Sequence, residues 1–250
     1  MRMAGSAGVK RTAGRLPNAK IFPLVVFATV VVLAAGCQTP AGGLSKSVPG
    51  IDPNDGDLTR ELLQLDAEIS DLDQLLGRYP ARFRSARERL AVHTRWAAAV
   101  EKSAVLLNVD LGNPELFARA GNLFRHGHNL GVPKASAAAY RALSRCIELA
   151  ADHIDCHYRL AQLLLTSQPR FAPTAERLLL RARSLISPQT RPEFEAELAR
   201  AYFAQGRRSE ALRQIDYYLT LRPHDDNAQR FRNVLTGRQH DGMGSRGPMR

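Results

Sequence analysis

The chain has 250 residues, with 35 Lys and Arg against 24 Asp and Glu, which gives a formal net charge of +11. Its 24% charged and 44% hydrophobic residues are ordinary globular values and exclude wholesale disorder. Three cysteines are too few for a disulfide-stapled scaffold or a cysteine-rich metal domain. Five of the cations lie in the first 36 residues, which hold no acid, so part of the charge belongs to the N-terminus alone.

Residues 1–36 have the layout of an export signal. Basic residues precede an apolar run of 16 residues, Ile21 to Gly36, which is shorter than the roughly 20 residues that cross a bilayer as a helix. The run ends in small residues and a cysteine, Leu33-Ala34-Ala35-Gly36-Cys37. This ending resembles the lipobox of bacterial lipoproteins, which implies cleavage before Cys37 and acylation of its thiol and its new amine. The alternatives are a soluble-export signal and an uncleaved anchor.

The resemblance also implies a location. Acyl chains on Cys37 would hold the protein on a membrane, and residues 37–57, rich in Gly, Pro and Ser, would be the lipidated cysteine and a flexible tether. Asp after the lipidated cysteine resembles an inner-membrane retention signal in Gram-negative lipoproteins. Residue 38 is Gln, which favours the outer membrane with the chain facing the periplasm. An exported chain meets no chromosome, so we expect no nucleic-acid partner.

From residue 58 to 236 the apolar period is helical, and residues 58–110 predict an N-terminal helical hairpin. The seam of the first helix comprises Leu58, Leu62, Leu65, Ile69, Leu72 and Leu76. The seam of the second comprises Phe83, Ala86, Leu90, His93, Ala97, Val100, Ala104 and Leu107. No Gly or Pro interrupts 81–107, so we expect one long helix there. The acids of the first helix are expected to face arginines at the start of the second, namely Arg82, Arg84, Arg87 and Arg89.

The remaining helices come in pairs, at 114–126, 134–151, 155–167, 173–186, 192–205, 208–221 and 225–235. Leu198-Ala199-x-x-Tyr202, followed by Gly206, Ala211, Ile215, Leu219 and Pro223, resembles the tetratricopeptide repeat (TPR). The same core recurs from Leu160 and from Ala120, at offsets of 38 and 40 residues. Because both exceed the roughly 34 residues of the unit, we expect the extra residues to form loops.

The resemblance implies an all-α, TPR-like solenoid of antiparallel helix pairs over 111–236, with a C-terminal capping helix and a disordered tail at 237–250. The alternative is a generic helical bundle. In the TPR family the first helix of each pair, helix A, lines a concave groove that binds a peptide or a helix. Among the positions of this sequence that match, the candidate groove residues are Asn122, Arg125, Tyr158, Gln162, Arg200 and Phe203.

Two further groups of residues could carry chemistry. Cys146 and Cys156 meet at a repeat junction and could form a disulfide in an oxidising compartment, the alternative being two buried thiols. The histidines at 126, 128, 153 and 157 are expected at the surface, with no metal site. No phosphate-binding loop, nucleophile elbow, HExxH or paired-carboxylate motif occurs, so we expect no enzymatic activity, cofactor or small-molecule substrate.

The sequence therefore predicts a membrane-anchored scaffold that binds other envelope proteins through its helix A groove. Exported lipoproteins of this size and repeat type resemble pilotins and pilus-biogenesis factors, which help secretin rings assemble. The alternatives are an accessory subunit of the outer-membrane protein assembly machinery and a self-assembling structural or cell-wall-associated lipoprotein.

Overall fold

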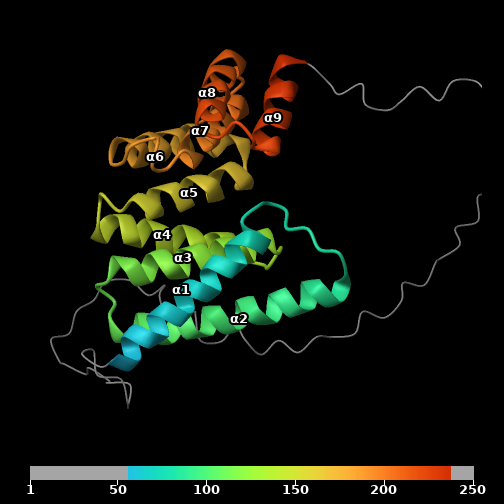
Figure 1. Ribbon diagram of the computed structural model, residues 1–250. Helices are drawn as coiled ribbons and strands as arrows, with labels where there is room; N and C mark the ends of the chain where they lie inside the picture. The colour runs from blue at the N-terminus through green and yellow to red at the C-terminus, as the bar shows by residue number, and fades with distance from the viewer. Residues whose placement is uncertain (1–55, 238–250) are drawn as a thin grey trace, which may run out of the picture. The chain divides into compact units, whose positions relative to one another are not determined.

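The computed structural model describes residues 56–237, and every α-helix in this range has its neighbours in chain order beside it (Figure 1). The predicted signal peptide, Cys37 and nearly all of the predicted tether and tail fall outside these residues. The helices are α1 (Gly56–Leu76), α2 (Ala86–Val109), α3 (Pro114–Asn129), α4 (Ala135–Leu149), α5 (Ile154–Ser167), η2 (Pro169–Phe171, a 3₁₀ turn), α6 (Ala172–Ser184), α7 (Glu193–Ala204), α8 (Arg208–Leu221) and α9 (Asp226–Thr236). No helix among them is both long and apolar enough to cross a membrane.

The helices stack as a solenoid. Each α-helix from α1 to α8 packs on the next, and the odd-numbered helices also contact one another, α1 on α3, α3 on α5 and α5 on α7. Within 56–237 the even-numbered helices make no comparable contacts with each other. The stack therefore curves with α1, α3, α5 and α7, the A helices, on its inner side. The predicted all-α solenoid of helix pairs is confirmed.

Small residues set the spacing within each pair. The alanines expected at the crossings of α3 with α4, α5 with α6 and α7 with α8 are between 0 and 2% exposed. They are Ala120 and Ala139, Ala161 and Ala175, and Ala199 and Ala211. Only a methyl group fits between two backbones that lie so close, so these alanines set the distance between the two helices of each pair. Gly206, at φ 76°, makes the left-handed turn between α7 and α8.

The first helix buries the predicted seam, whereas the seam predicted for the second is exposed at Ala86, Leu90 and His93 and partly buried from Ala97 onward. Leu65, Ile69, Leu72 and Leu76 are buried on α1. On α2, by contrast, Leu90 is 64% exposed and His93 is exposed. The buried face of α2 comprises Val92, Trp96, Ala99, Ser103 and Leu106. The predicted seam was wrong over the first turns of α2, because the helix carries two adjacent stripes of small and apolar residues.

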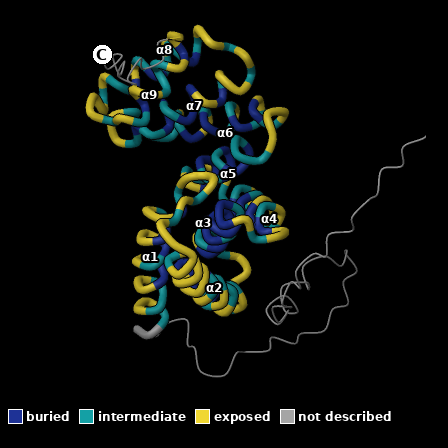
Figure 2. The backbone as a smooth tube through the Cα atoms, turned by 90° about the vertical axis from the view of Figure 1, so that its right-hand side faces the viewer, coloured by how far each residue is buried: buried dark blue, intermediate teal, exposed yellow. Residues whose placement is uncertain are grey.

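Trp96 decides between the two stripes. Its indole is buried, and its Nε1–H donates to the backbone oxygen of Leu123 on α3 at 2.6 Å. A tryptophan with both its ring and its polar edge satisfied fixes the rotation of α2 about its own axis. Figure 2 shows the result, with α3 buried at the centre of this level and α2 exposed along its outer side.

The helix expected from residue 81 begins later, at Ala86. Ser85 caps it by accepting from the backbone N–H of Glu88, and the Glu88 carboxylate accepts from the backbone N–H of Arg84. This Ser-x-x-Glu arrangement is a capping signal visible in the sequence. Residues 77–85 instead run as an irregular segment, in which the Ala81 N–H donates to the Asn129 oxygen at the end of α3.

The charges of α1 also find other partners than predicted. Glu68 and Asp71 pair with Arg95, Glu61 pairs with Lys102, and Asp66 pairs with Arg119 of α3. The arginines expected to face these acids are exposed instead. These exposed cations form a basic segment made of Arg82, Arg84, Arg87 and Arg89.

Candidate functional site

The six predicted groove residues lie on α3, α5 and α7, and their exposure increases along the stack. The side chains of α3 are buried, those of α5 are buried or half-buried, and those of α7 are exposed. In that order they are Asn122 and Arg125, Tyr158 and Gln162, and Arg200 and Phe203. The inner face is therefore closed at its N-terminal end and open at its C-terminal end.

The closed end is organised around one carboxylate, that of Asp73 on α1. It accepts from Arg125 Nη2 at 2.8 Å, contacts His126 Nε2 at 2.8 Å, and accepts from Arg159 Nη2 at 2.9 Å. Asn122 donates to Asp73 at 3.3 Å and accepts from Arg125 Nε at 3.0 Å. Helix α1 thus fills this part of the groove, and its own acid satisfies the donors that a partner was expected to meet. Asn122 and Arg125 are not available to a partner in this structure.

Burial and charge together set the ionisation of this cluster. Burial alone would raise the pKa of Asp73, but the hydrogen bond from His126 and the charges of Arg159 and Arg125 hold it well below its usual range. Burial lowers the pKa of His126 to about 4, so at neutral pH its imidazole is uncharged and donates Nε2–H to Asp73. Burial lowers the pKa of Arg125 to about 10, which still leaves it charged. The cluster therefore holds one acid and two guanidinium ions.

Two histidines expected at the surface lie within α3. His126 is fully buried, and the ring of His128 stacks on Tyr79 with centroids 4.8 Å apart. The extra residues of this repeat lengthen the helix to Asn129, which donates to the Leu76 oxygen at 2.6 Å. The loop prediction was wrong here because the added turn packs against the end of α1.

The middle of the groove is filled by side chains that join α5 to α7. The ring of Tyr158 packs on Phe194 with centroids 4.9 Å apart. The Arg191 guanidinium lies over the Tyr158 ring, 5.6 Å from its centroid. Gln162 Nε2 donates to the Tyr158 hydroxyl at 2.9 Å and to Glu197 at 3.3 Å. Burial raises the pKa of Tyr158, so its hydroxyl stays neutral. In this structure these side chains serve to join α5 to α7.

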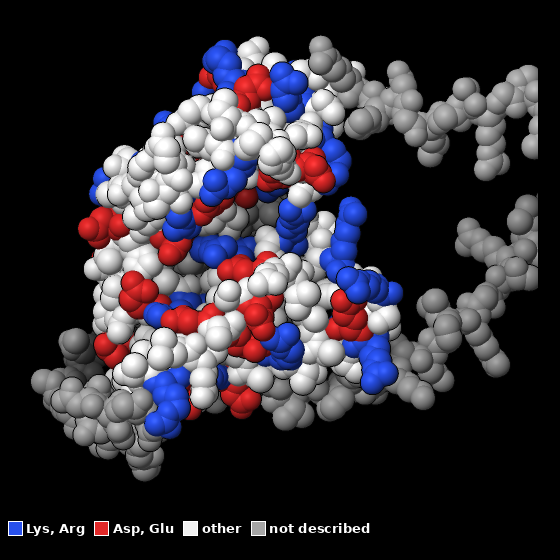
Figure 3. All heavy atoms as spheres, viewed as in Figure 1, with Lys and Arg blue, Asp and Glu red and all other residues white. Residues whose placement is uncertain are grey.

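The open end presents a cation beside two aromatic rings. The Arg200 side chain is 54% exposed and pairs with Glu197 at 3.1 Å. Phe203 is 43% exposed, and its ring meets Phe231 of α9 edge to face, with centroids 5.5 Å apart. We call Arg200, Phe203 and Phe231 the open patch. In Figure 3 the surface is hollowed between the α1–α3 level and the α7–α9 level, and Lys and Arg side chains border the hollow.

Cys146 of α4 and Cys156 of α5 are bonded to each other in the structure, with Cα atoms 6.3 Å apart. The bond closes the junction between two repeats. His153 lies between them in the chain and caps α5, with its Nδ1 accepting from the Cys156 N–H at 3.4 Å. His157 turns away and contacts the Ala151 oxygen through Nε2 at 2.9 Å.

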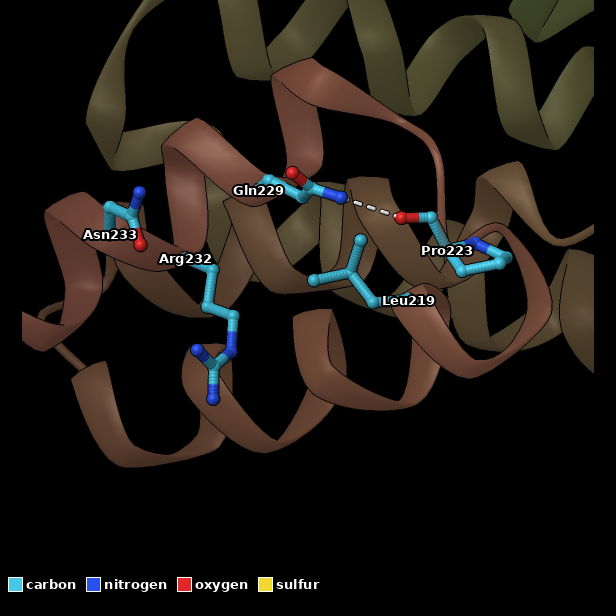
Figure 4. A pocket seen from close by; sticks show the side chains of 5 residues that line it. All are labelled: Leu219, Pro223, Gln229, Arg232 and Asn233. Carbon is cyan, nitrogen blue, oxygen red and sulfur yellow. Dashed lines mark hydrogen bonds between the residues drawn. The ribbon is translucent and has the colours of Figure 1, made fainter.

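One further depression lies between α8 and α9. It is lined by Leu219, Pro223, Gln229, Arg232 and Asn233, and Gln229 donates to the Pro223 oxygen at 2.6 Å (Figure 4). Arg232 also pairs with Asp216. The depression holds one charged side chain whose partner is already in place, so it offers no convergent acid and base.

The similarity of this chain to known proteins lies in the arrangement of its helices. No protein-family model and no curated protein matches the sequence. The crystal structure of MamA aligns over 62% of this chain and 85% of its own length, with 15% identity and a TM-score of 0.49. TTC0263, a thermophilic TPR protein of Thermus thermophilus, aligns over 72% of this chain and 95% of its own, with 17% identity and a TM-score of 0.49. The assignment of helix pairs in this chain rests on its own contacts and repeat spacing.

Proposed function

We propose that this chain is a scaffold that binds a protein partner through the open patch. The observation that carries the proposal is the contrast along the inner face. The predicted groove residues of α3 and α5 are buried or half-buried among partners within the chain. At the C-terminal end Arg200 pairs with Glu197 but stays 54% exposed, and Phe203 is 43% exposed. An exposed cation beside aromatic rings is the kind of pair that anchors protein interfaces.

We also propose that the scaffold is a lipoprotein of the outer membrane, held through Cys37 and facing the periplasm. The support is the basic leader, the apolar run from Ile21 to Gly36 and the Gly-Cys ending. A tethered scaffold in this place would meet envelope proteins, and assembly of a pilus or secretin machine is the role that lipoproteins of this type suggest. An accessory role in outer-membrane protein assembly is the alternative.

Site-specific crosslinking in living cells tests the binding surface. A photoreactive phenylalanine analogue is placed at Phe203 of the full chain and, as the control, at Tyr140, which is 51% exposed but lies on α4, outside the inner face. We expect Phe203 alone to give a discrete product with another protein. A product of twice the chain mass would support self-assembly instead. Equal products from both positions, or none from Phe203, would contradict the proposed surface.

A further inference from the structure

Three metal-binding side chains converge at the junction of α4 and α5. The Sγ atoms of Cys146 and Cys156 and a ring nitrogen of His153 lie within 4.8 Å of one another. Both cysteines are fully buried, and the His153 side chain is 11% exposed. The three residues are fixed by two helices and by the turn between them, which is the rigidity that a metal site needs.

Glu115 of α3 and the backbone of Cys156 fix the orientation of the His153 ring. Its Nε2 lies 3.1 Å from Oε1 of Glu115 on α3, so a carboxylate holds the proton on that nitrogen. Its Nδ1 carries the lone pair, which in the oxidised chain accepts a long, 3.4 Å hydrogen bond from the Cys156 backbone N–H. A metal ion bound at Nδ1 would replace this bond. A carboxylate that holds the far nitrogen of a ligating histidine is a common outer-shell arrangement around bound metal ions.

The disulfide and a metal site exclude one another, since bonded sulfurs are not thiolates. Two Zn–S bonds of about 2.3 Å at a tetrahedral angle place sulfurs roughly 3.8 Å apart. Side-chain rotation can reach that separation from Cα atoms 6.3 Å apart. We propose that reduction of the Cys146–Cys156 disulfide opens a Cys₂His site for Zn²⁺, made by the two thiolates and Nδ1 of His153, with water in the fourth position.

The chemistry of the opening step balances as follows. A phosphine reductant and one water convert the disulfide into two thiols and a phosphine oxide. On binding Zn²⁺ the thiols release two protons to solvent, and the thiolates become ligands. The metal would link α4 to α5 where the disulfide did, so the junction stays closed in both states and the redox state decides which link is present.

Cobalt(II) serves as the spectroscopic probe. The full chain carrying Cys37→Ser, which retains only the two relevant cysteines, is reduced with phosphine and titrated with Co²⁺. We expect thiolate-to-cobalt charge-transfer absorption and tetrahedral ligand-field bands, both lost when one equivalent of Zn²⁺ is added. The oxidised chain should show neither. A reduced, folded chain without these bands, or bands of equal strength in the oxidised chain, would overturn the proposal.

Three variants assign the ligands. His153→Asn keeps an acceptor that caps α5 but removes the imidazole, and it should weaken Co²⁺ binding at least tenfold. Glu115→Gln should weaken it about tenfold, as loss of an outer-shell partner does. His224→Ala, a change at an exposed histidine far along the chain, is the control and should bind like the parent. Unchanged affinity in His153→Asn, with circular dichroism showing an intact fold, would also overturn the proposal.

Discussion

Asp73 and Arg159 are 86 residues apart in the sequence, yet Oδ2 of the first lies 2.9 Å from Nη2 of the second. In a solenoid each repeat ordinarily contacts only its neighbours. This ion pair instead joins α1 to α5, past α3, and α3 contributes Arg125 and His126 to the same carboxylate. Three A helices therefore share one acid, and unfolding of α1 should be coupled to that of α5.

The first prediction concerns that acid. Asp73→Asn keeps the shape of the side chain but leaves the buried Arg125 and the half-buried Arg159 without a carboxylate. Removing one member of a buried charge cluster costs about 3 kcal/mol, and we expect this loss in the free energy of unfolding at pH 7, measured by urea denaturation. Asp71→Asn, which removes an exposed pair with Arg95, is the control and should cost less than about 1 kcal/mol.

The pH dependence of the same variant checks the cause. The pKa of Asp73 is lowered in the folded chain, so its contribution is present above the unfolded value of about 3.9 and is lost as the pH falls below it. His126, with its pKa lowered to about 4, adds a separate loss of stability between about pH 6.5 and 4. The difference in stability between wild type and variant should therefore begin to shrink below about pH 4. A stability difference that stays constant down to pH 3 would show that the charge of Asp73 is not responsible.

The contrast between local and distant signals explains which features could be predicted from sequence. The alanine spacing, such as Ala199 with Ala211, is local to one repeat and specified the helix pairs. The burial of Arg125 depends on where α1 crosses the stack, and no spacing within its own repeat records that. Ser85 and Glu88 form a capping motif that can be read from the sequence and that marks the start of α2 at Ala86. The choice of Trp96 over Leu90 as the buried side of α2 was decided by the hydrogen bond to Leu123.

The second prediction concerns the contact of α2 with α3. A Cβ added at Gly127 would lie 2.5 Å from Cζ2 of Trp96, and the indole is held in place by its bond to Leu123. We expect Gly127→Ala to destabilise the chain by about 1–2 kcal/mol, because overpacking outweighs the helix propensity gained. The only tryptophan of the chain reports the change by fluorescence. Gly112→Ala, at an exposed turn, is the control, and an equal loss there would refute the steric explanation.

The third prediction concerns the disulfide. The intact protein, isolated without reductant, should weigh two hydrogens less than the reduced protein by mass spectrometry. Opening a loop of this length should lower the free energy of unfolding by roughly 2–3 kcal/mol, measured on the metal-free reduced protein. Free reaction of Cys146 and Cys156 with a maleimide before any reduction would contradict the bond.

The fourth prediction concerns the N-terminus. Cys37→Ser removes the thiol proposed to carry the lipid, so we expect an uncleaved or wrongly processed precursor and no incorporation of labelled fatty acid. Cys146→Ser is the matched control, because it removes a cysteine that lies outside the signal and should leave labelling intact. Equal labelling of the Cys37→Ser chain would rule out lipidation at this site.

The last prediction separates the open patch from the basic segment as binding surfaces, once crosslinking at Phe203 has yielded a partner. Arg200→Ala combined with Phe203→Ala removes the exposed cation and ring while leaving the Asp73 cluster intact. Truncating an interface anchor costs about 2 kcal/mol, roughly thirtyfold in affinity, and circular dichroism should remain that of the wild type. Replacing Arg84, Arg87 and Arg89 with Gln should mainly slow association and flatten its salt dependence, because exposed charges act chiefly on encounter. If the Gln variant loses the partner while the patch variant keeps it, the basic segment is the docking surface.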